Sequence, residues 1–264
     1  PATFAAVSAS LTATRDAFPD LRIQSMLDVG SGPGTALWAA ASVWPELERA
    51  TLLEASEHAR RTGQQLAKDL TGLEASWLAG DATIDLSALQ QHDLVTCAYV
   101  LDEITPASLP KLIERLWHLT GEMLVIVEPG TPAGWQRILA ARAQLIEAGA
   151  QIIAPCAHNV PCPIVAPDWC HFSRRVARSR VHRLAKDADV PWEDEKFIYL
   201  AASRHAPVAR ESRVLAPARS GAGRAQLKLC RQAGNAPLPG GVRLVCPDDV
   251  VRSVVVNNDR LDVT

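Results

Sequence analysis

The chain has 264 residues, of which 48% are hydrophobic and 21% charged, a composition typical of a globular protein that buries a sizeable core. No apolar run approaches the roughly 20 residues of a membrane-spanning helix, and the N-terminus lacks the basic and apolar regions of a secretory signal. We therefore expect a cytoplasmic protein without a membrane partner. The net charge of −2 conceals an asymmetry, because residues 1–150 carry −8 and residues 151–264 carry +6. The basic, arginine-rich second half indicates an anionic partner, with phosphate as the first candidate.

The first functional pattern is a glycine loop in the sequence SMLDVGSGPGTALWAAASVW. A short apolar run, Met26 to Val29, precedes three glycines and an alanine-rich segment, which predicts a strand, a tight turn and a helix. Such glycines allow a ligand to approach the backbone, and the helix N-terminus offers free N–H groups. The spacing G-x-G-x-G, with Asp28 two residues before it, resembles the first motif of class I S-adenosylmethionine (SAM) methyltransferases. It departs from the G-x-G-x-x-G of dinucleotide-binding folds.

Companion patterns follow the glycine loop in the order that this fold requires. A second apolar strand ends at Glu54, whose carboxylate can accept both ribose hydroxyls, and Asp81 follows a third strand, where the fold usually holds the adenine. A fourth strand is expected from Asp93 to Ala98 and a fifth in EMLVIVEPG, with helical segments between the strands. The predicted SAM-binding residues are Asp28, Gly30, Gly32, Gly34, Glu54, Asp81, Ala82 and Ala98. The alternative is an α/β domain that has lost its ligand.

No catalytic residue is assigned from the sequence. Enzymes that methylate amino groups of nucleic acids often carry an Asn/Asp-Pro-Pro-aromatic motif after the fourth strand, and this chain has CAYVLDEI there. Cys97 lies in the apolar strand without flanking prolines, so we interpret it as a buried structural residue. Asp102 and Glu103 are conceivable proton acceptors, but carboxylates at the start of a helix, next to a favourable dipole, are the simpler interpretation.

Three of the six cysteines lie close together in CAHNVPCPIVAPDWCHFSRR, which begins at the end of the sixth predicted strand, QIIAPC. The seventh, EDEKFIYLAASR, is expected to pair antiparallel with the sixth, so the roughly forty residues between them form an insertion of a size that is generally functional. Prolines stiffen the loop and remove backbone donors, which suits a site built around sulfur. In a reducing compartment, clustered thiols indicate metal binding. The spacing C-x5-C-x7-C matches no common motif, and the candidates for a fourth ligand are His158, His171, Cys230 and Cys246.

Four stretches together resemble the methyltransferase-like assembly factors of the mitochondrial small ribosomal subunit and their bacterial relatives. They are LDVGSGPGTALWAA, CAHNVPCPIVAPDWCHFSRR, EDEKFIYLAASR and AQLKLCRQAG. Within them, DWCHF and EDEKF are far more specific than the glycine loop, and the resemblance covers nearly the whole chain. It implies a class I methyltransferase fold in a protein that binds the maturing small-subunit ribosomal RNA.

The resemblance also implies a four-iron four-sulfur (4Fe-4S) cluster held by four cysteines. Carried over by position, its ligands are Cys156, Cys162, Cys170 and Cys230. Thiolates suit zinc as well as iron, so a structural zinc remains the alternative. In a eukaryote the expected compartment is the mitochondrial matrix. The chain does not begin with Met and departs from longer members by the absence of their N-terminal helical region, so we expect a processed chain or a piece of a longer one.

A run of basic residues follows the cysteine loop in HFSRRVARSRVHRLAK. Helical spacing predicts that Arg174, Arg175, Arg178, Arg180 and Arg183 are distributed around a helix. A charged run is often only a solvated helix face. Beside the cysteine loop and in the basic half of the chain, we favour a surface that binds RNA phosphates and positions the RNA without reading its sequence.

From about Pro207, short β-like runs broken by Gly, Pro and Asn predict a small antiparallel appendage. We therefore expect a seven-stranded α/β, Rossmann-like SAM-methyltransferase domain in residues 1–205, with a metal-cluster insertion at about 154–190, and a small β-rich region in residues 206–264. The hypothesis is a SAM-binding, iron–sulfur protein that acts on small-subunit ribosomal RNA or on a pre-ribosomal particle. It is either an RNA methyltransferase or a non-catalytic assembly factor, and a small-molecule methyltransferase with a structural zinc is a further alternative.

Overall fold

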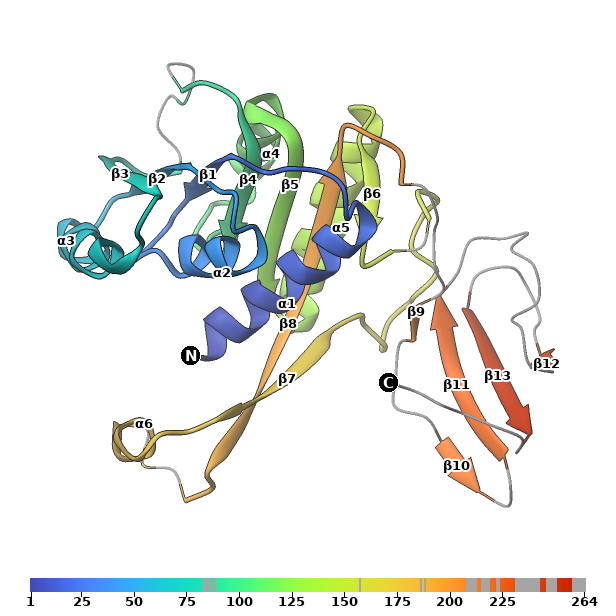
Figure 1. Ribbon diagram of the computed structural model, residues 1–264. Coiled ribbons are helices and arrows are strands. Elements are labelled where there is room, and N and C mark those ends of the chain that lie inside the picture. Colours follow the sequence, from blue (N-terminus) through green and yellow to red (C-terminus); the bar gives the residue numbers. More distant parts are fainter. Residues whose placement is uncertain are drawn as a thin grey trace.

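Figure 1 shows a computed structural model of the chain. It describes residues 1–82, 86, 89–156, 158–185, 187 and 189–207, and beyond them the strand segments 213–214, 219–221, 224–230, 243–245 and 251–257. Past residue 207, the described side chain is that of Cys230. The elements form two sheets. One is a large mixed sheet covered by helices, and the other is a smaller antiparallel sheet.

The strands of the large sheet are β1 (Ser25–Val29), β2 (Arg49–Glu54), β3 (Glu74–Ala79), β4 (His92–Ala98), β5 (Thr120–Pro129), β6 (Gln151–Ala154), β7 (Phe172–Ala177) and β8 (Trp192–Ser203). Seven of them run in the order β3-β2-β1-β4-β5-β8-β6, and β7 pairs with β8 outside this path. Strands β1 to β5 pair in parallel, whereas β8 is antiparallel to both β5 and β6. This arrangement confirms the predicted Rossmann-like sheet of class I methyltransferases. As predicted, β6 and β8 pair antiparallel.

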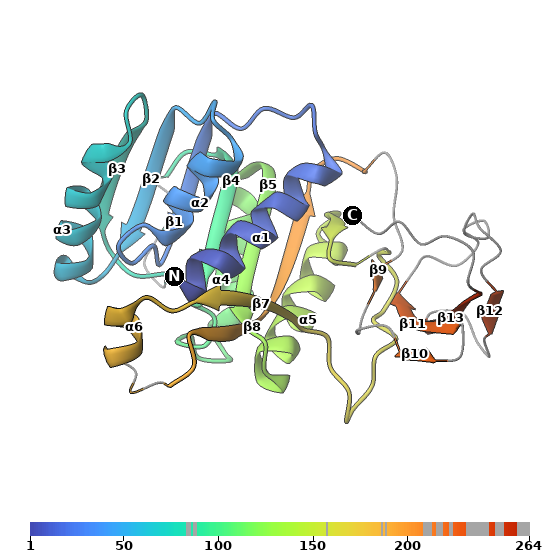
Figure 2. The ribbon, with the colours of Figure 1, turned by 60° about the horizontal axis from the view of Figure 1, so that its bottom comes forward.

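The helices are α1 (Ala2–Ala17), α2 (Thr35–Val43), α3 (Glu57–Leu66), α4 (Leu109–Leu119), α5 (Pro132–Glu147) and α6 (Arg180–Ala185), with a short 3-10 helix at Ala67–Asp69. Figures 1 and 2 show helices on both faces of the large sheet. One hydrophobic core joins α1 and α2 to the sheet, and a second joins α4 and α5 to the opposite face. The central strand β1 is buried along its whole length, as expected for a parallel strand covered on both sides.

Strand β8 has two halves with different environments. Residues 192–196 are exposed or half-buried and pair with β7, whereas residues 197–203 are buried, pair with β5 along their whole length and pair with β6 at residues 201–203. The exposed half, β7 and α6 form an arm, residues 172–196, that projects from the sheet (Figures 1 and 2). Strand β8 therefore passes from the arm into the hydrophobic core between residues 196 and 197.

The arm corrects the prediction of one helix through the arginine run. Residues 172–177 form strand β7, and only residues 180–185 are helical. Pairing between strands explains the difference, because Arg174 lies opposite Glu195 and Arg175 opposite Asp194. Opposite charges that face each other across two strands stabilise a sheet. The helix prediction used only the spacing within residues 171–186, so it did not include these partners on β8.

The smaller sheet contains β9 (Arg213–Val214), β10 (Arg219–Gly221), β11 (Arg224–Cys230), β12 (Arg243–Val245) and β13 (Val251–Asn257). All its pairings are antiparallel, in the order β10-β11-β13-β12 with β9 on β11, as predicted for the appendage. The domain boundary at residues 205 and 206 stays a prediction. Within the described residues, no helix has the length and apolar character needed to cross a membrane.

Candidate functional sites

The glycine loop between β1 and α2 is fixed to the end of β2 by backbone hydrogen bonds. The N–H groups of Gly30 and Ser31 both donate to the carbonyl of Leu53, at 2.9 and 3.0 Å. The Gly32 N–H donates to Glu54 Oε2 at 2.8 Å, and the Ser56 N–H donates to Glu54 Oε1 at 2.7 Å. Glu54 thus holds the loop while both of its oxygens keep lone pairs for a further donor.

Two glycines of the loop are required for different reasons. Gly30 has a φ of +73°, and a Cβ added there would collide with Cγ2 of Val100. Gly32 has a φ of +53°, but an added Cβ would meet nothing within 4 Å. The first glycine therefore allows close packing, and the second leaves its backbone facing open space.

That open space is a pocket of about 430 Å³ at the carboxyl ends of β1, β2 and β3, within the ~300–1,000 Å³ usual for small-molecule sites. Of the predicted SAM residues, those that line it are Gly30, Gly32, Glu54, Asp81 and Ala82. Unpredicted lining residues include Tyr99, Val100 and Glu103. Asp28, Gly34 and Ala98 do not line it. Gly34 is instead the left-handed residue that precedes α2, and Ala98 ends β4.

Asp28 is completely enclosed behind the glycine loop. It is 1% exposed; Thr96 Oγ1 donates to its Oδ1 at 2.7 Å, and its Oδ2 has no hydrogen-bond partner. Burial raises the pKa of Asp28 to about 7, against the effect of the Thr96 hydrogen bond and with a smaller contribution from the Glu54 charge. Asp28 is therefore a buried acid beneath the pocket and not one of its walls.

Tyr99 occupies the position after β4 where the sequence lacks a methyltransferase motif. It is one of two described non-glycine residues with positive φ, at 60°, and its hydroxyl donates to Glu195 Oε1 on β8 at 2.8 Å. Burial raises the pKa of Tyr99, and the hydrogen bond to Glu195 adds to this effect. The phenol is thus engaged with the base of the arm. Nothing in the sequence around Tyr99 predicts its backbone conformation.

The carboxylates after β4 differ from the prediction. Helix α4 begins at Leu109, so Asp102 and Glu103 lie in a turn and not at a helix start. Arg137 pairs with Asp102 at 2.7 Å and with the buried Glu128 at 2.7 Å. Burial raises the pKa of Glu128, while Arg137 opposes that rise. Of these carboxylates, Glu103 lines the pocket.

Cys97 is buried in β4, as predicted. It is 0% exposed, and burial raises the pKa of its thiol well above the usual value, which disfavours the reactive thiolate.

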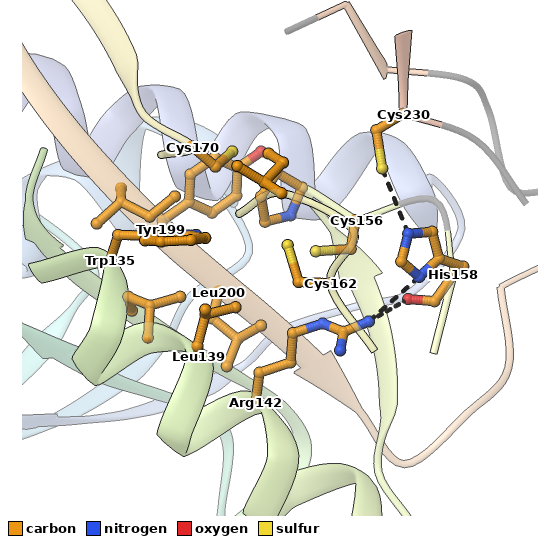
Figure 3. Close-up of a pocket in the computed structure, with 14 residues that line it drawn as sticks. Trp135, Leu139, Arg142, Cys156, His158, Cys162, Cys170, Tyr199, Leu200 and Cys230 are labelled. Atoms are coloured by element: carbon orange, nitrogen blue, oxygen red, sulfur yellow. Dashed lines mark hydrogen bonds between the residues drawn. The ribbon is translucent and has the colours of Figure 1, made fainter. Parts of the chain in front are cut away.

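The four cysteines predicted as ligands all line one cavity between α5, β8 and the cysteine loop. They are Cys156, Cys162, Cys170 and Cys230, and the remaining lining is mostly apolar. Figure 3 shows Cys156 and Cys162 beside each other, Cys170 on the side of Tyr199, and Cys230 on the side of His158. Within the described parts of the chain, no three His, Cys, Asp or Glu side chains form a group that could hold a single metal ion. The ligand roles therefore stay predictions.

The other candidates for the fourth ligand behave differently. His158 lines the cavity, is 2% exposed, and has its Nε2 3.3 Å from Cys230 Sγ. His171 does not line the cavity, and its ring stacks on Trp169 with centroids 5.1 Å apart. Trp169 in turn donates from Nε1 to the Gly130 carbonyl at 3.0 Å, which fixes the cysteine loop to the turn after β5. Cys246 lies outside the described residues.

A buried arginine completes the cysteine cavity. Arg142 on α5 is 4% exposed, lines the cavity, and has an Nε without a hydrogen-bond partner. The predictions from the sequence do not include Arg142, although its position in the pattern of apolar residues along α5 indicates that it is buried. Trp135, Ile138 and Leu145 mark the buried face of α5, and Arg142 falls on that same apolar face.

The five predicted RNA-binding arginines lie on the arm, but they are not equivalent. Arg175 donates from Nε and NH2 to both carboxylate oxygens of Asp194, each at 2.8 Å. Arg178 pairs with Glu193 at 3.1 Å and is largely buried. Arg174 and Arg180 are exposed, while Arg183 is half-buried. The arm therefore offers less free positive charge than the sequence indicates.

A family model described as "Mitochondrial small ribosomal subunit Rsm22" matches residues 1–237. The chain belongs to the Rsm22 family. The resemblance predicted from the sequence is thereby confirmed.

Among curated proteins, the human "Ribosome assembly protein METTL17, mitochondrial" is 28% identical over 218 residues, which are 77% of this chain and 47% of that protein. "Rsm22-cox11 tandem protein 2, mitochondrial" of Schizosaccharomyces pombe is 25% identical over 182 residues, 61% of this chain and 24% of that protein. This chain therefore spans about half of the human relative and about a quarter of the yeast one.

Solved structures similar to this chain include two methyltransferases. The magnesium protoporphyrin IX methyltransferase of Synechocystis with bound SAM has a TM-score of 0.48 and 17% identity, covering 75% of this chain and 78% of that one. The precorrin-6y C5,15-methyltransferase of Geobacter metallireducens has a TM-score of 0.47 and 14% identity, covering 72% and 84%. The strand order and directions define the fold independently of these similarities.

Proposed function

We propose that the protein is a SAM-binding assembly factor of the small ribosomal subunit that carries an iron–sulfur cluster. The observation that carries this proposal is the family match, which extends over residues 1–237 and so includes the glycine-loop pocket, the cysteine cavity and the arm. The human relative is itself named a ribosome assembly protein. The expected compartment is the one where small subunits mature, the cytoplasm in a bacterium or the mitochondrial matrix in a eukaryote.

The glycine-loop pocket is the proposed SAM site. Glu54 is fixed by the Gly32 and Ser56 N–H groups and can still accept the ribose hydroxyls, while Asp81 and Ala82 line the neighbouring wall for the adenine. Calorimetry tests this assignment. Wild-type protein is expected to bind SAM, and Glu54→Gln is expected to bind it at least tenfold more weakly, because one strong acceptor is replaced by an amide donor. Glu57→Gln on the exposed start of α3 is the matched control.

The cysteine cavity is the proposed cluster site, and its chemistry fits such a group. Four thiols converge on a cavity that also contains the buried guanidinium of Arg142 with an unpaired Nε. A buried cation without a nearby anion is unfavourable, and a thiolate-bound cluster supplies negative charge. Cys156, Cys162, Cys170 and Cys230 would hold the cluster. When bound, it supplies a covalent link between the cysteine loop and β11, and a centre able to exchange electrons.

The arm is the proposed RNA contact. Arg174 and Arg180 are exposed, and an arginine fork suits phosphate oxygens. The arm's carboxylates, among them Glu193 and Asp194, limit its net charge. We therefore propose that it positions RNA at a few phosphates and leaves recognition of the particle to other surfaces.

A second candidate function is RNA methylation, which the SAM pocket favours. The phenol of Tyr99 donates to Glu195, and Glu103 is the carboxylate after β4 that lines the pocket. The sequence after β4 lacks the Asn/Asp-Pro-Pro-aromatic motif of enzymes that methylate amino groups of nucleic acids, so we favour the non-catalytic factor. Small-subunit precursor particles, incubated with the protein and methyl-labelled SAM, distinguish the candidates. Binding without methyl transfer supports the assembly factor, and transfer above background identifies an enzyme. Absence of particle binding, together with transfer to a small molecule, would contradict the ribosomal role.

A further inference from the structure

Two buried side chains that are not cysteines connect the separate parts of the cysteine cavity. Arg142 on α5 donates from NH2 to the carbonyls of His158 and Val160, at 2.6 and 2.8 Å. These bonds fix the middle of the cysteine loop to a helix of the main core. The loop segment between Cys156 and Cys162 therefore has a rigid support.

His158 continues this connection to the smaller sheet. Its Nε2 lies 3.3 Å from Sγ of Cys230, the last residue of β11. Its Nδ1 lies 3.1 Å from the Val160 carbonyl and 3.4 Å from NH2 of Arg142. Figure 3 shows the ring between Cys230 and Arg142. Nδ1 donates to the Val160 carbonyl in one tautomer and accepts from Arg142 in the other, and only the second places a proton on the Nε2 that faces the sulfur.

Both groups have a clear electrostatic role next to thiolates. An N–H that donates to a thiolate ligand stabilises its negative charge, as does a buried cation nearby. Arg142 shares the lining of the cavity with the four cysteines, so it lies where bound thiolates would place negative charge. Partners of this kind outside the ligand set typically change metal affinity by about 10- to 100-fold.

We propose that Arg142 and His158 are positioning residues of the cysteine site, which hold Cys230 of β11 beside the three cysteines of the loop and balance the charge of the bound thiolates. This inference rests on the proposed cluster function. It assigns Cys230 as the ligand and His158 as its hydrogen-bond partner, which donates from Nε2 to the thiolate in the tautomer whose Nδ1 accepts from Arg142.

Paired substitutions test the hydrogen bond. An Asn side chain places its N–H near the Nδ1 position of histidine, whereas Gln reaches the Nε2 position. His158→Asn is therefore expected to lose the bond to Cys230, and His158→Gln to keep it. The matched control is His171→Gln, in the same loop and outside the cavity. Arg142→Met removes the cation but retains much of the buried volume.

The first measurement is the reduction potential of the cluster and the rate at which a chelator removes its iron. For His158→Asn and Arg142→Met, we expect a more negative potential and iron loss about tenfold faster than in the wild type. His158→Gln and His171→Gln are expected to resemble the wild type. Equal effects of His158→Asn and His171→Gln would overturn the proposal. So would loss of all iron in His158→Asn with retention in Cys230→Ser, which would make His158 the ligand.

The second measurement does not depend on metal. In chelator-treated protein, alkylation of Cys230 by iodoacetamide is followed by peptide mass spectrometry. We expect His158→Asn to be labelled about tenfold faster than the wild type, because the ring no longer holds the thiol in place. If the wild type contains no iron, the proposed cluster function fails, and the alkylation rates alone decide the positioning role. Equal rates in the wild type and His158→Asn would overturn it.

Discussion

Asp28 is expected to destabilise the protein at neutral and alkaline pH. Burial raises its pKa to about 7 from an ordinary value of 3.8. The unfolded chain therefore releases this proton at lower pH than the folded chain does. As pH rises from about 4 to 7, the unfolded state binds fewer protons than the native state, and the free energy of unfolding falls. Asn at this position has a similar shape and no charge, so it removes this dependence.

The magnitude follows from the two pKa values. At 1.36 kcal/mol for each pKa unit, ionised Asp28 costs about 4 kcal/mol at pH 8, and only about 0.5 kcal/mol at pH 4. Asp28→Asn should therefore increase the free energy of unfolding by about 2–4 kcal/mol at pH 8, the lower figure allowing for the changed bond to Thr96.

Urea unfolding of both proteins at pH 5 and pH 8 measures the difference, and Asp69→Asn, at an exposed position, is the control. If Asp28→Asn raised the free energy of unfolding equally at both pH values, or lowered it at pH 8, the reasoning would be refuted.

Two further comparisons test the glycine loop and the arm. Gly30→Ala should lower the free energy of unfolding by about 2–4 kcal/mol, because its Cβ collides with the Val100 side chain at positive φ, whereas Gly32→Ala should cost about 1 kcal/mol and mainly weaken SAM binding. Thermal unfolding and SAM calorimetry measure these effects, and equal losses of stability would contradict the assignment. RNA affinity falls as salt rises, and Arg174→Ala should reduce the slope of log affinity against log salt concentration by about 0.7–0.9. Arg175→Ala should change it less, because two of its donors are held by Asp194. Filter binding over a salt series measures the slopes, and identical slopes would refute the distinction.

The sequence predicts the sheet well because the information is local. The second strand ends at Glu54, and the fourth strand ends at Ala98, both as expected. The sequence does not predict helix α1, because its alanine-rich segment has little contrast in hydrophobicity between its faces. Its Val7 and Leu11 are nevertheless buried.

The arm and the cysteine cavity depend on contacts between distant segments. Pairing of Arg175 with Asp194 selects a strand where helical periodicity predicts a helix. The spacing of the three loop cysteines likewise does not predict that Cys230 reaches the same cavity, and only the family resemblance indicates it. The sequence does not identify Arg142 as a site residue, because a charge on an apolar helix face is assigned a role only by the groups that surround it in the fold.

Iron, zinc and acid-labile sulfide content, measured with an absorption spectrum on protein purified without oxygen, tests the central claim most directly. The account predicts about four irons and four sulfides per chain. It also predicts that Cys170→Ser loses them and that Cys97→Ala, a change within the buried strand β4, keeps them. One zinc without sulfide, or iron content unchanged in Cys170→Ser, would contradict it.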